Sequence, residues 1–473
     1  MLKIAEICTH GNPVDEGLAR GLLRLRSSKT EALTMLDAAT TPFSLTLLTA
    51  TKGNASKRLV PDGNSHPVKD PEHRLSISAG WVEHIRLAGL AGLRDLLARI
   101  QPNQALVHGI PHESTPGTRY TLVVAGRYTG TPGTIARTLD CFAYPPGARL
   151  LMLDYDPEPQ ATHRLTGPQE LMDRLAAIWP AFGEVGWLAT VRTSSAIRDK
   201  HTQAWLRPPE GMHVYLLVTG DVARWRELAN VRLWLAGYGF CKLATPNRHT
   251  GVPSILERCL VDLTVFSPER LDYVAGAQIP KTAPFIQDRP KPELHPGPVL
   301  DLDSLPDVTK QERQSYATLV AETQARVEPE RRRCVRAHIT RTTPDLSEAA
   351  IEQEIRTRLD RAERGELDAN HPLVFDNGTT CTAGTLSQAL DGRWLHDPQE
   401  PDYGRNKAVL HWRDGDWRIV SWAHGVKRVY RLLLTKPGPS SLVSDSWEGM
   451  STLPLKPYTG YRGLRYRREV RYA

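Results

Sequence analysis

Residues 150–157 read Leu-Leu-Met-Leu-Asp-Tyr-Asp-Pro, an apolar run that ends in Asp154 and Asp156. Residues i and i+2 of a β-strand point to the same face, so the two aspartates are expected side by side at the end of a buried strand. Adjacent carboxylates repel each other and are costly to desolvate, and a fold that holds them together usually gives them a cation. The pair therefore indicates a divalent-metal site, with a solvated strand end before a turn as the alternative.

Two later segments carry residues that could complete such a site. Gly211–Val218 is a β-rich run with His213 near its start, and Ile255–Phe266 is predicted to be another strand, with Asp262 in its apolar middle. A carboxylate in apolar surroundings needs a partner or a metal. Three acids and one histidine, each on or beside a predicted strand, thus form a candidate constellation.

Six segments follow one another along the chain: LMLDYDP, TSSAIRD, GMHVYLLV, RLWLAGYGF, LERCLVDLTVF and SPERLDYVAGA. In this order they resemble the motifs of the archaeo-eukaryotic primase superfamily, and most closely its primase-polymerases from phages, plasmids and integrating elements. The resemblance covers roughly residues 40–280 and, more loosely, 310–435. One departure is that the tight Ser-x-His of many relatives is absent, because Ser194 and Ser195 lie well upstream of His213.

The resemblance implies an α+β fold, with an archaeo-eukaryotic primase catalytic core made of an α/β layer and an RRM-like mixed sheet. A helical module and a small β-rich module are expected to follow. It also implies that Asp154, Asp156 and Asp262 hold two Mg²⁺ or Mn²⁺ ions and catalyse nucleotidyl transfer, as in a DNA primase and DNA polymerase. The expected nucleotide contacts are Ser194, Ser195, His213 and Arg258. For Arg258, a surface ion pair remains the alternative.

The domain organisation is predicted from proline density and periodicity. Prolines crowd between Ile279 and Pro306, which predicts an extended linker. Helical spacing of apolar residues predicts helices over Trp81–Ile100, Gly167–Trp179 and Val222–Trp234. The expected parts are an N-terminal helical extension (1–40), the catalytic core (41–279), a Pro-rich linker (280–310), a helical module (311–370), a small β-rich module (371–440) and a basic aromatic tail (441–473).

The charge of the chain is consistent with a nucleic-acid partner. The 473 residues carry a formal net charge of +7, and the pI is near 9.0. Such an excess allows phosphate neutralisation and counterion release. In Tyr461–Tyr472 arginines alternate with tyrosines, which suits phosphates and stacked bases, although a basic tail without a specific role is the alternative. The expected partners are a single-stranded DNA template and nucleoside triphosphates.

The cysteines and the lengths of the apolar stretches bear on the cellular location of the protein. The six cysteines are scattered without a C-x-x-C, so neither a disulfide framework nor a four-cysteine zinc site is expected, and a reducing cytoplasm fits. No apolar stretch approaches the roughly 20 residues of a transmembrane helix, so no membrane partner is expected. Glu6, His10 and Asp15 interrupt any apolar core at the start of the chain, which argues against a secretory signal.

Two other function classes stay open. One is a non-catalytic replication module that binds nucleic acid and recruits a helicase. The other is a nicking replication initiator, which usually needs a His-x-His pair, whereas His213-Val214-Tyr215 supplies one histidine. The chain contains no G-x-x-x-x-G-K-[ST], so a replicative helicase that works with it is expected to be a separate polypeptide.

Overall fold

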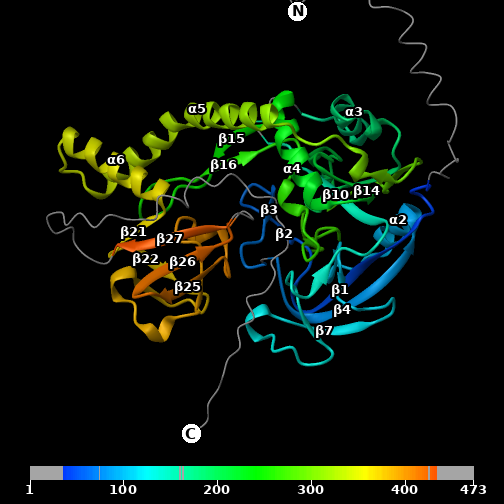
Figure 1. The fold of residues 1–473 in the computed structure, drawn as a ribbon, viewed down its shortest axis with the longest axis horizontal. Helices are drawn as coiled ribbons and strands as arrows, with labels where there is room; N and C mark the ends of the chain where they lie inside the picture. The colour runs from blue at the N-terminus through cyan, green and yellow to red at the C-terminus, as the bar shows by residue number, and fades with distance from the viewer. Residues whose placement is uncertain (1–35, 74, 159–160, 162–163, 424–426, 434–473) are drawn as a thin grey trace, which may run out of the picture.

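The computed structural model describes residues 36–433 except 74, 159–160, 162–163 and 424–426 (Figure 1). Most of the expected helical extension (1–40) and the whole basic aromatic tail (441–473) lie outside the described residues. The described chain is a mixed α+β protein with several sheets and few helices, which confirms the predicted class at that level. No helix in this part of the chain has the length and apolar character to cross a membrane.

A six-stranded sheet, here called the N-terminal sheet, is built around two long antiparallel strands. Its order is β17 (Leu271–Asp272), β5 (Gln104–Val107), β1 (Pro42–Asn54), β4 (Ser76–Ala88), β7 (Arg119–Val123) and β8 (Thr134–Ala136). The predicted helix over Trp81–Ile100 is wrong in its first half, because β4 continues to Ala88 and only α2 (Gly89–Arg99) is helical. Gly89 makes the break with a φ of 68°, and a Cβ there would collide with the carbonyl oxygen of Ala39.

A second sheet, the central sheet, holds the predicted metal strand. Its order is β10 (Arg149–Tyr155), β14 (Met212–Thr219), β11 (Trp187–Val191) and β19 (Glu293–His295), with β20 (Leu300–Asp301) parallel to the end of β14. Seven of the eight residues of β14 are buried, which explains its nearly unbroken apolar sequence. The helices α3 (Pro168–Ile178) and α4 (Val222–Leu233) confirm two predicted helices and share one hydrophobic core with this sheet.

The proline-rich segment differs from the extended linker that its composition predicts. β18 (Phe285–Gln287) pairs with β12 (Ile197–Asp199), while β19 and β20 pair with the central sheet. Leu300 and Leu302 are 2% and 0% exposed. The prolines fall between these short strands, so every strand residue keeps the N–H that a ladder needs. Residues 280–310 therefore pack as part of the folded core, and the prediction of an extended linker is wrong.

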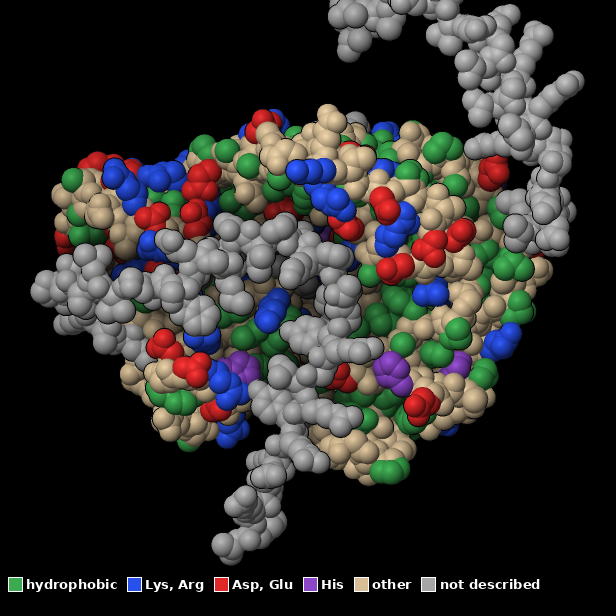
Figure 2. Space-filling model, in the orientation of Figure 1, with side chains coloured by type: hydrophobic (Ala, Val, Ile, Leu, Met, Phe, Trp, Pro, Cys, Tyr) green, Lys and Arg blue, Asp and Glu red, His purple; other side chains and the backbone are tan. Residues whose placement is uncertain are grey.

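The C-terminal third forms two further parts. The helical module consists of α5 (Lys310–Thr342) and α6 (Glu348–Arg364), and charged side chains of both signs crowd its surface (Figure 2). A capping box of Thr309 and Glu312 starts α5, and Glu312 also pairs with Arg232 of the core at 3.0 Å. The β-rich module is a sheet in the order β21 (Glu366–Asp368), β27 (Arg428–Leu433), β26 (Asp416–Ser421), β25 (Ala408–Arg413) and β24 (Trp394–Leu395).

Short strands complete the described chain. They form the pairs β2 (Leu59–Pro61) with β3 (Pro67–Lys69), β6 (Ile110–Pro111) with β9 (Phe142–Ala143), β12 with β13 (Trp205–Arg207), β15 (Phe240–Leu243) with β16 (Ile255–Arg258), and β22 (Pro372–Val374) with β23 (Thr380–Thr382).

The packing of the proline-rich segment can be tested by substitution. Because the Leu302 side chain is fully buried, Leu302→Ala should lower the free energy of unfolding by about 2–5 kcal/mol. Ile286→Ala is the matched control in the same segment, since Ile286 is 39% exposed, and it should change stability by no more than about 0.5 kcal/mol. Urea unfolding measures both. Equally small effects would mean that the segment is a free linker.

Candidate acidic centre at the end of β10

Asp154 and Asp156, here called the acidic pair, lie at the carboxyl end of β10. Asp154 is the penultimate residue of the strand and stands opposite His213 of β14 in the antiparallel register. Its side chain is 15% exposed, whereas that of Asp156, one residue beyond the strand, is 50% exposed. The intervening Tyr155 is buried, and its hydroxyl accepts a hydrogen bond from the Leu165 N–H at 2.9 Å. The two carboxylates share one arginine partner, as expected of residues that lie on the same side of the strand.

Asp262 lies next to β10, but not on the strand that the sequence predicts for it. The strand expected over Ile255–Phe266 ends at Arg258, and Asp262 precedes a short 3₁₀ helix, η4 (Leu263–Val265). Its main-chain N–H donates to the Asp154 carbonyl at 2.9 Å, which ties this segment to β10. Its carboxylate accepts the Thr264 N–H at 2.8 Å and so caps η4. The prediction of a strand is wrong, although the third acid does lie beside β10.

Arg192 supplies the positive charge at the acidic pair. Its guanidinium pairs with the Asp156 carboxylate and lies 3.8 Å from Oδ1 of Asp154. That Asp154 oxygen is buried and accepts no hydrogen bond. Burial raises the pKa of Asp154, and His213 and Arg192 only partly oppose this effect. A buried carboxylate oxygen without a hydrogen-bond donor fits a metal ligand, so a divalent cation would compete with Arg192 for this place.

A preassembled metal cage is absent from the described residues, where no three His, Cys, Asp or Glu side chains gather closely enough to hold an ion. Two observations explain this. The carboxylate of Asp262 is turned toward the backbone of η4, and Arg192 takes the position between the other two acids. Two aspartates, one with an oxygen that accepts no hydrogen bond, form a donor set that fits a cation, while Asp262 would have to give up its hydrogen bond with the Thr264 N–H to join them.

His213 is held between two carboxylates. Its Nδ1 lies 3.2 Å from Oδ1 of Asp272, and its Nε2 lies 3.5 Å from Oδ1 of Asp154. The Tyr215 hydroxyl and the His108 ring also contact Asp272, at 2.7 and 3.3 Å. Burial alone would lower the pKa of His213, but Asp272 and Asp154 together outweigh it and raise that pKa. The two carboxylates thus favour the charged form of the imidazole against the effect of burial, and a charged imidazole suits an anionic group such as a phosphate.

The nucleotide contacts predicted on the serine loop separate into two kinds. Ser194 points to Lys57, whose Nζ lies 3.4 Å from the serine hydroxyl. Burial and the nearby Arg192 lower the pKa of Lys57 to about 8. Ser195 instead donates its hydroxyl to the Glu210 carbonyl, so its side chain fixes the loop. Ser194 thus lies among the charges of the candidate centre, and Ser195 acts as a structural residue.

Arg258 is not brought into the acidic centre. It lies on β16 and donates to the carbonyl of its neighbour Glu257 at 2.8 Å. In the described part of the chain it forms no ion pair with any of the three aspartates or with another acid, so the alternative of a surface ion pair is not seen, and the triphosphate contact stays a prediction.

Arg192, Asp272 and Lys57 were not identified from the sequence as residues of this site. Asp272 had a usable signal, because it is a lone carboxylate within the run Leu271–Ala275. For Arg192 and Lys57 the sequence contains no such signal, since a single basic residue next to a strand or a turn is common on protein surfaces.

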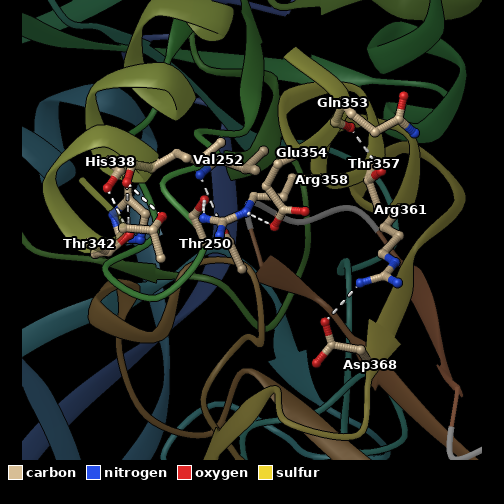
Figure 3. Close-up of polar contacts among 12 residues, drawn as sticks. Thr250, Val252, His338, Thr342, Gln353, Glu354, Thr357, Arg358, Arg361 and Asp368 are labelled. Carbon is tan, nitrogen blue, oxygen red and sulfur yellow. Dashed lines mark hydrogen bonds and ion pairs between the residues drawn. The ribbon is translucent and has the colours of Figure 1, made fainter. Parts of the chain in front are cut away.

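A cavity of about 450 Å³ lies elsewhere, between α6, the loop 247–252 and the β-rich module. Figure 3 shows its polar walls, where Arg358 donates to the Thr250 carbonyl and pairs with Glu354, and Arg361 pairs with Asp368. Each arginine already has an acidic partner, so the cavity has no surplus charge for a phosphate. We assign these contacts to the joining of the modules.

Comparison with known proteins gives no matching family model, no matching curated protein and no matching solved structure. The function is therefore argued from the side chains around the acidic pair.

Competition between Arg192 and a divalent cation can be measured directly. Arg192→Ala leaves two carboxylates without their positive neighbour, so Mn²⁺ should bind on the order of tenfold more tightly than to the wild type. Calorimetric titration gives the affinities. Arg198→Ala is the control, because Arg198 pairs with Asp288 at 2.9 Å and not with the acidic pair. Unchanged or weaker Mn²⁺ binding by Arg192→Ala would contradict the competition.

The role of Asp272 can be tested through the titration of His213. Asp272→Asn removes the carboxylate that does most to raise the pKa of His213, so burial should dominate and the ring should lose its proton at a lower pH than in the wild type. NMR of the ring protons follows this titration. Asp288→Asn removes a carboxylate from the Arg198 pair and should leave the curve in place. An unshifted curve in Asp272→Asn would show that Asp272 does not hold the charge on His213.

Proposed function

We propose that the chain is a DNA primase-polymerase that performs template-directed nucleotidyl transfer on single-stranded DNA, with Mg²⁺ or Mn²⁺. The observation that carries the proposal is the acidic pair at the end of a buried strand, with a buried carboxylate oxygen that accepts no hydrogen bond and a histidine beside it. The resemblance to archaeo-eukaryotic primases supports the same function. Nucleoside triphosphates, a DNA template and a separate replicative helicase are the partners proposed with it.

The topology of the central sheet supports the finer assignment of a primase core. Along the chain the elements run β10, α3, β11, β14 and α4, and in space β14 lies between β10 and β11, antiparallel to both. This is the split β-α-β arrangement of ferredoxin-like sheets, the group that includes RRM-like folds. In the proposal, the central sheet is the RRM-like part of the core and the N-terminal sheet is its α/β layer.

The chain's own residues would divide the work. The divalent cations, held by Asp154, Asp156 and Asp262, would activate the attacking 3′-hydroxyl and neutralise the leaving pyrophosphate. His213, held between Asp272 and Asp154, would donate a hydrogen bond to a phosphate of the incoming nucleotide. Lys57, beside Ser194, would add a second positive contact. In the absence of divalent ions, Arg192 keeps the two carboxylates of the acidic pair together.

A second candidate is a nucleic-acid-binding module without catalysis. It is favoured by one observation, namely that Arg192 already neutralises the acidic pair and could do so permanently. A nicking initiator has less support. Tyr215 would be the tyrosine of the motif, but its ring is fully buried and its hydroxyl donates to Asp272, so it is not placed to attack DNA.

Nucleotide incorporation separates the two candidates. The wild-type chain, an unprimed single-stranded template and labelled nucleotides should yield product with Mg²⁺ or with Mn²⁺. Asp154→Asn and Asp156→Asn keep the side-chain volume and remove one charge each, so both should reduce the rate at least about a hundredfold while the fold remains. Asp288→Asn is the control and should remain active.

Two results would refute the enzyme. One is a wild-type chain that binds the template but incorporates nothing under either metal, which supports the non-catalytic module. The other is near wild-type synthesis by both variants of the acidic pair, which would place catalysis elsewhere.

A further inference from the structure

The outer face of the β-rich module's sheet carries two cross-strand rows of different chemistry. The first row joins Trp394, Val409, Val420 and Val429 in register across β24, β25, β26 and β27. The residues between them, such as Ile419 and Tyr430, point inward and belong to the module's core. By the alternation of a strand, the row lies on the face away from that core.

This first row is more apolar than an outer face requires. An antiparallel sheet with one face in water usually alternates apolar and polar residues, with the polar ones outside. Here Val429 is 44% exposed, and Trp422, which follows β26, is 45% exposed. The indole rings of Trp394 and Trp422 lie 6.2 Å apart, whereas Val409, in the middle of the row, is only 7% exposed. Two large rings thus lie together on this face, with Trp422 exposed and Trp394 half-buried.

The second row is basic. His411, Arg418 and Arg431 stand opposite one another on β25, β26 and β27. Like charges directly across a strand pair destabilise a sheet, and Arg418 faces Arg431. In the described part of the chain neither of these arginines forms an ion pair with an acid. An anion placed between them would relieve the repulsion.

We propose that this face, defined by Trp394, Trp422, Val429, Arg418 and Arg431, binds single-stranded nucleic acid. Unpaired bases would stack on the indoles while the backbone phosphates lie along the arginine row. Aromatic faces next to a positive track are the combination that recognises single strands without sequence preference. Duplex DNA fits less well, because its bases are stacked on each other and offer no free face. Binding of nucleic acid at this face involves no covalent step and does not use the acidic pair. The face would therefore bind nucleic acid even if the chain is not an enzyme.

The test is binding of a labelled oligothymidine of about 20 nucleotides, longer than the ~4–16 that one single-strand-binding fold covers. Fluorescence anisotropy is measured on the full chain in EDTA, which excludes synthesis, over a series of salt concentrations. Trp422→Ala should weaken binding roughly 5- to 150-fold, the range for loss of one stacked base, and Trp422→Phe should restore most of it. Arg418→Ser with Arg431→Ser should weaken binding and lower the salt slope by about 1.4, or 0.7 per lost phosphate contact.

Arg99→Ser is the matched charge control, because Arg99 is an exposed arginine at the end of α2, far from the module (Figure 1). It should leave affinity and slope unchanged. Wild-type affinity in both Trp422→Ala and the double arginine variant would overturn the proposal, and would leave a protein as the occupant of the face. Equal losses in Arg99→Ser would also overturn it, since the effect would then report net charge alone.

Discussion

Burial of the Asp154 carboxylate next to Asp156 is the constraint on which the centre of this structure depends. A buried strand brings the two groups to one place, and burial raises the pKa of Asp154, with a smaller contribution from Asp156 in the same direction. Basic side chains from neighbouring segments compensate this negative charge. Arg192 lies against both carboxylates, and His213 stands across the strand pair from Asp154. The same demand for positive charge makes this place suitable for a divalent ion.

The sheet explains how these groups are held. β14 lies between β10 and β11, so His213 faces Asp154 on one side and Thr190 on the other. Asp272 comes from β17, which belongs to the N-terminal sheet, and its contact with His213 links the two sheets through a polar network. A buried network of this kind is stable only when its members are paired, which fixes the orientation of the imidazole. In the proposed enzyme, the position of the phosphate-binding histidine thus depends on the packing of both sheets.

The sequence predicts the parts of this arrangement that follow from local patterns. The apolar run before Asp154 and the one around His213 form adjacent strands, and α3 and α4 follow their helical periodicity. Prediction from the sequence is wrong where contacts between distant segments decide the local structure. Prolines exclude long strands but permit the two- and three-residue strands of 285–301, whose partners lie far away in the chain. Asp262 caps a 3₁₀ helix because its carboxylate accepts a hydrogen bond from the Thr264 N–H. The apolar residues around Asp262 predict a strand and give no sign of this cap.

The central claim is that the acidic pair binds divalent cations, and Mn²⁺ electron paramagnetic resonance tests it most directly. The signal of free Mn²⁺ is recorded while the full chain is titrated with the metal, without nucleotide or DNA. The wild-type chain should remove Mn²⁺ from the free signal, and a chain with Asp154→Asn and Asp156→Asn should do so far less. Equal Mn²⁺ binding by the two folded proteins would contradict it.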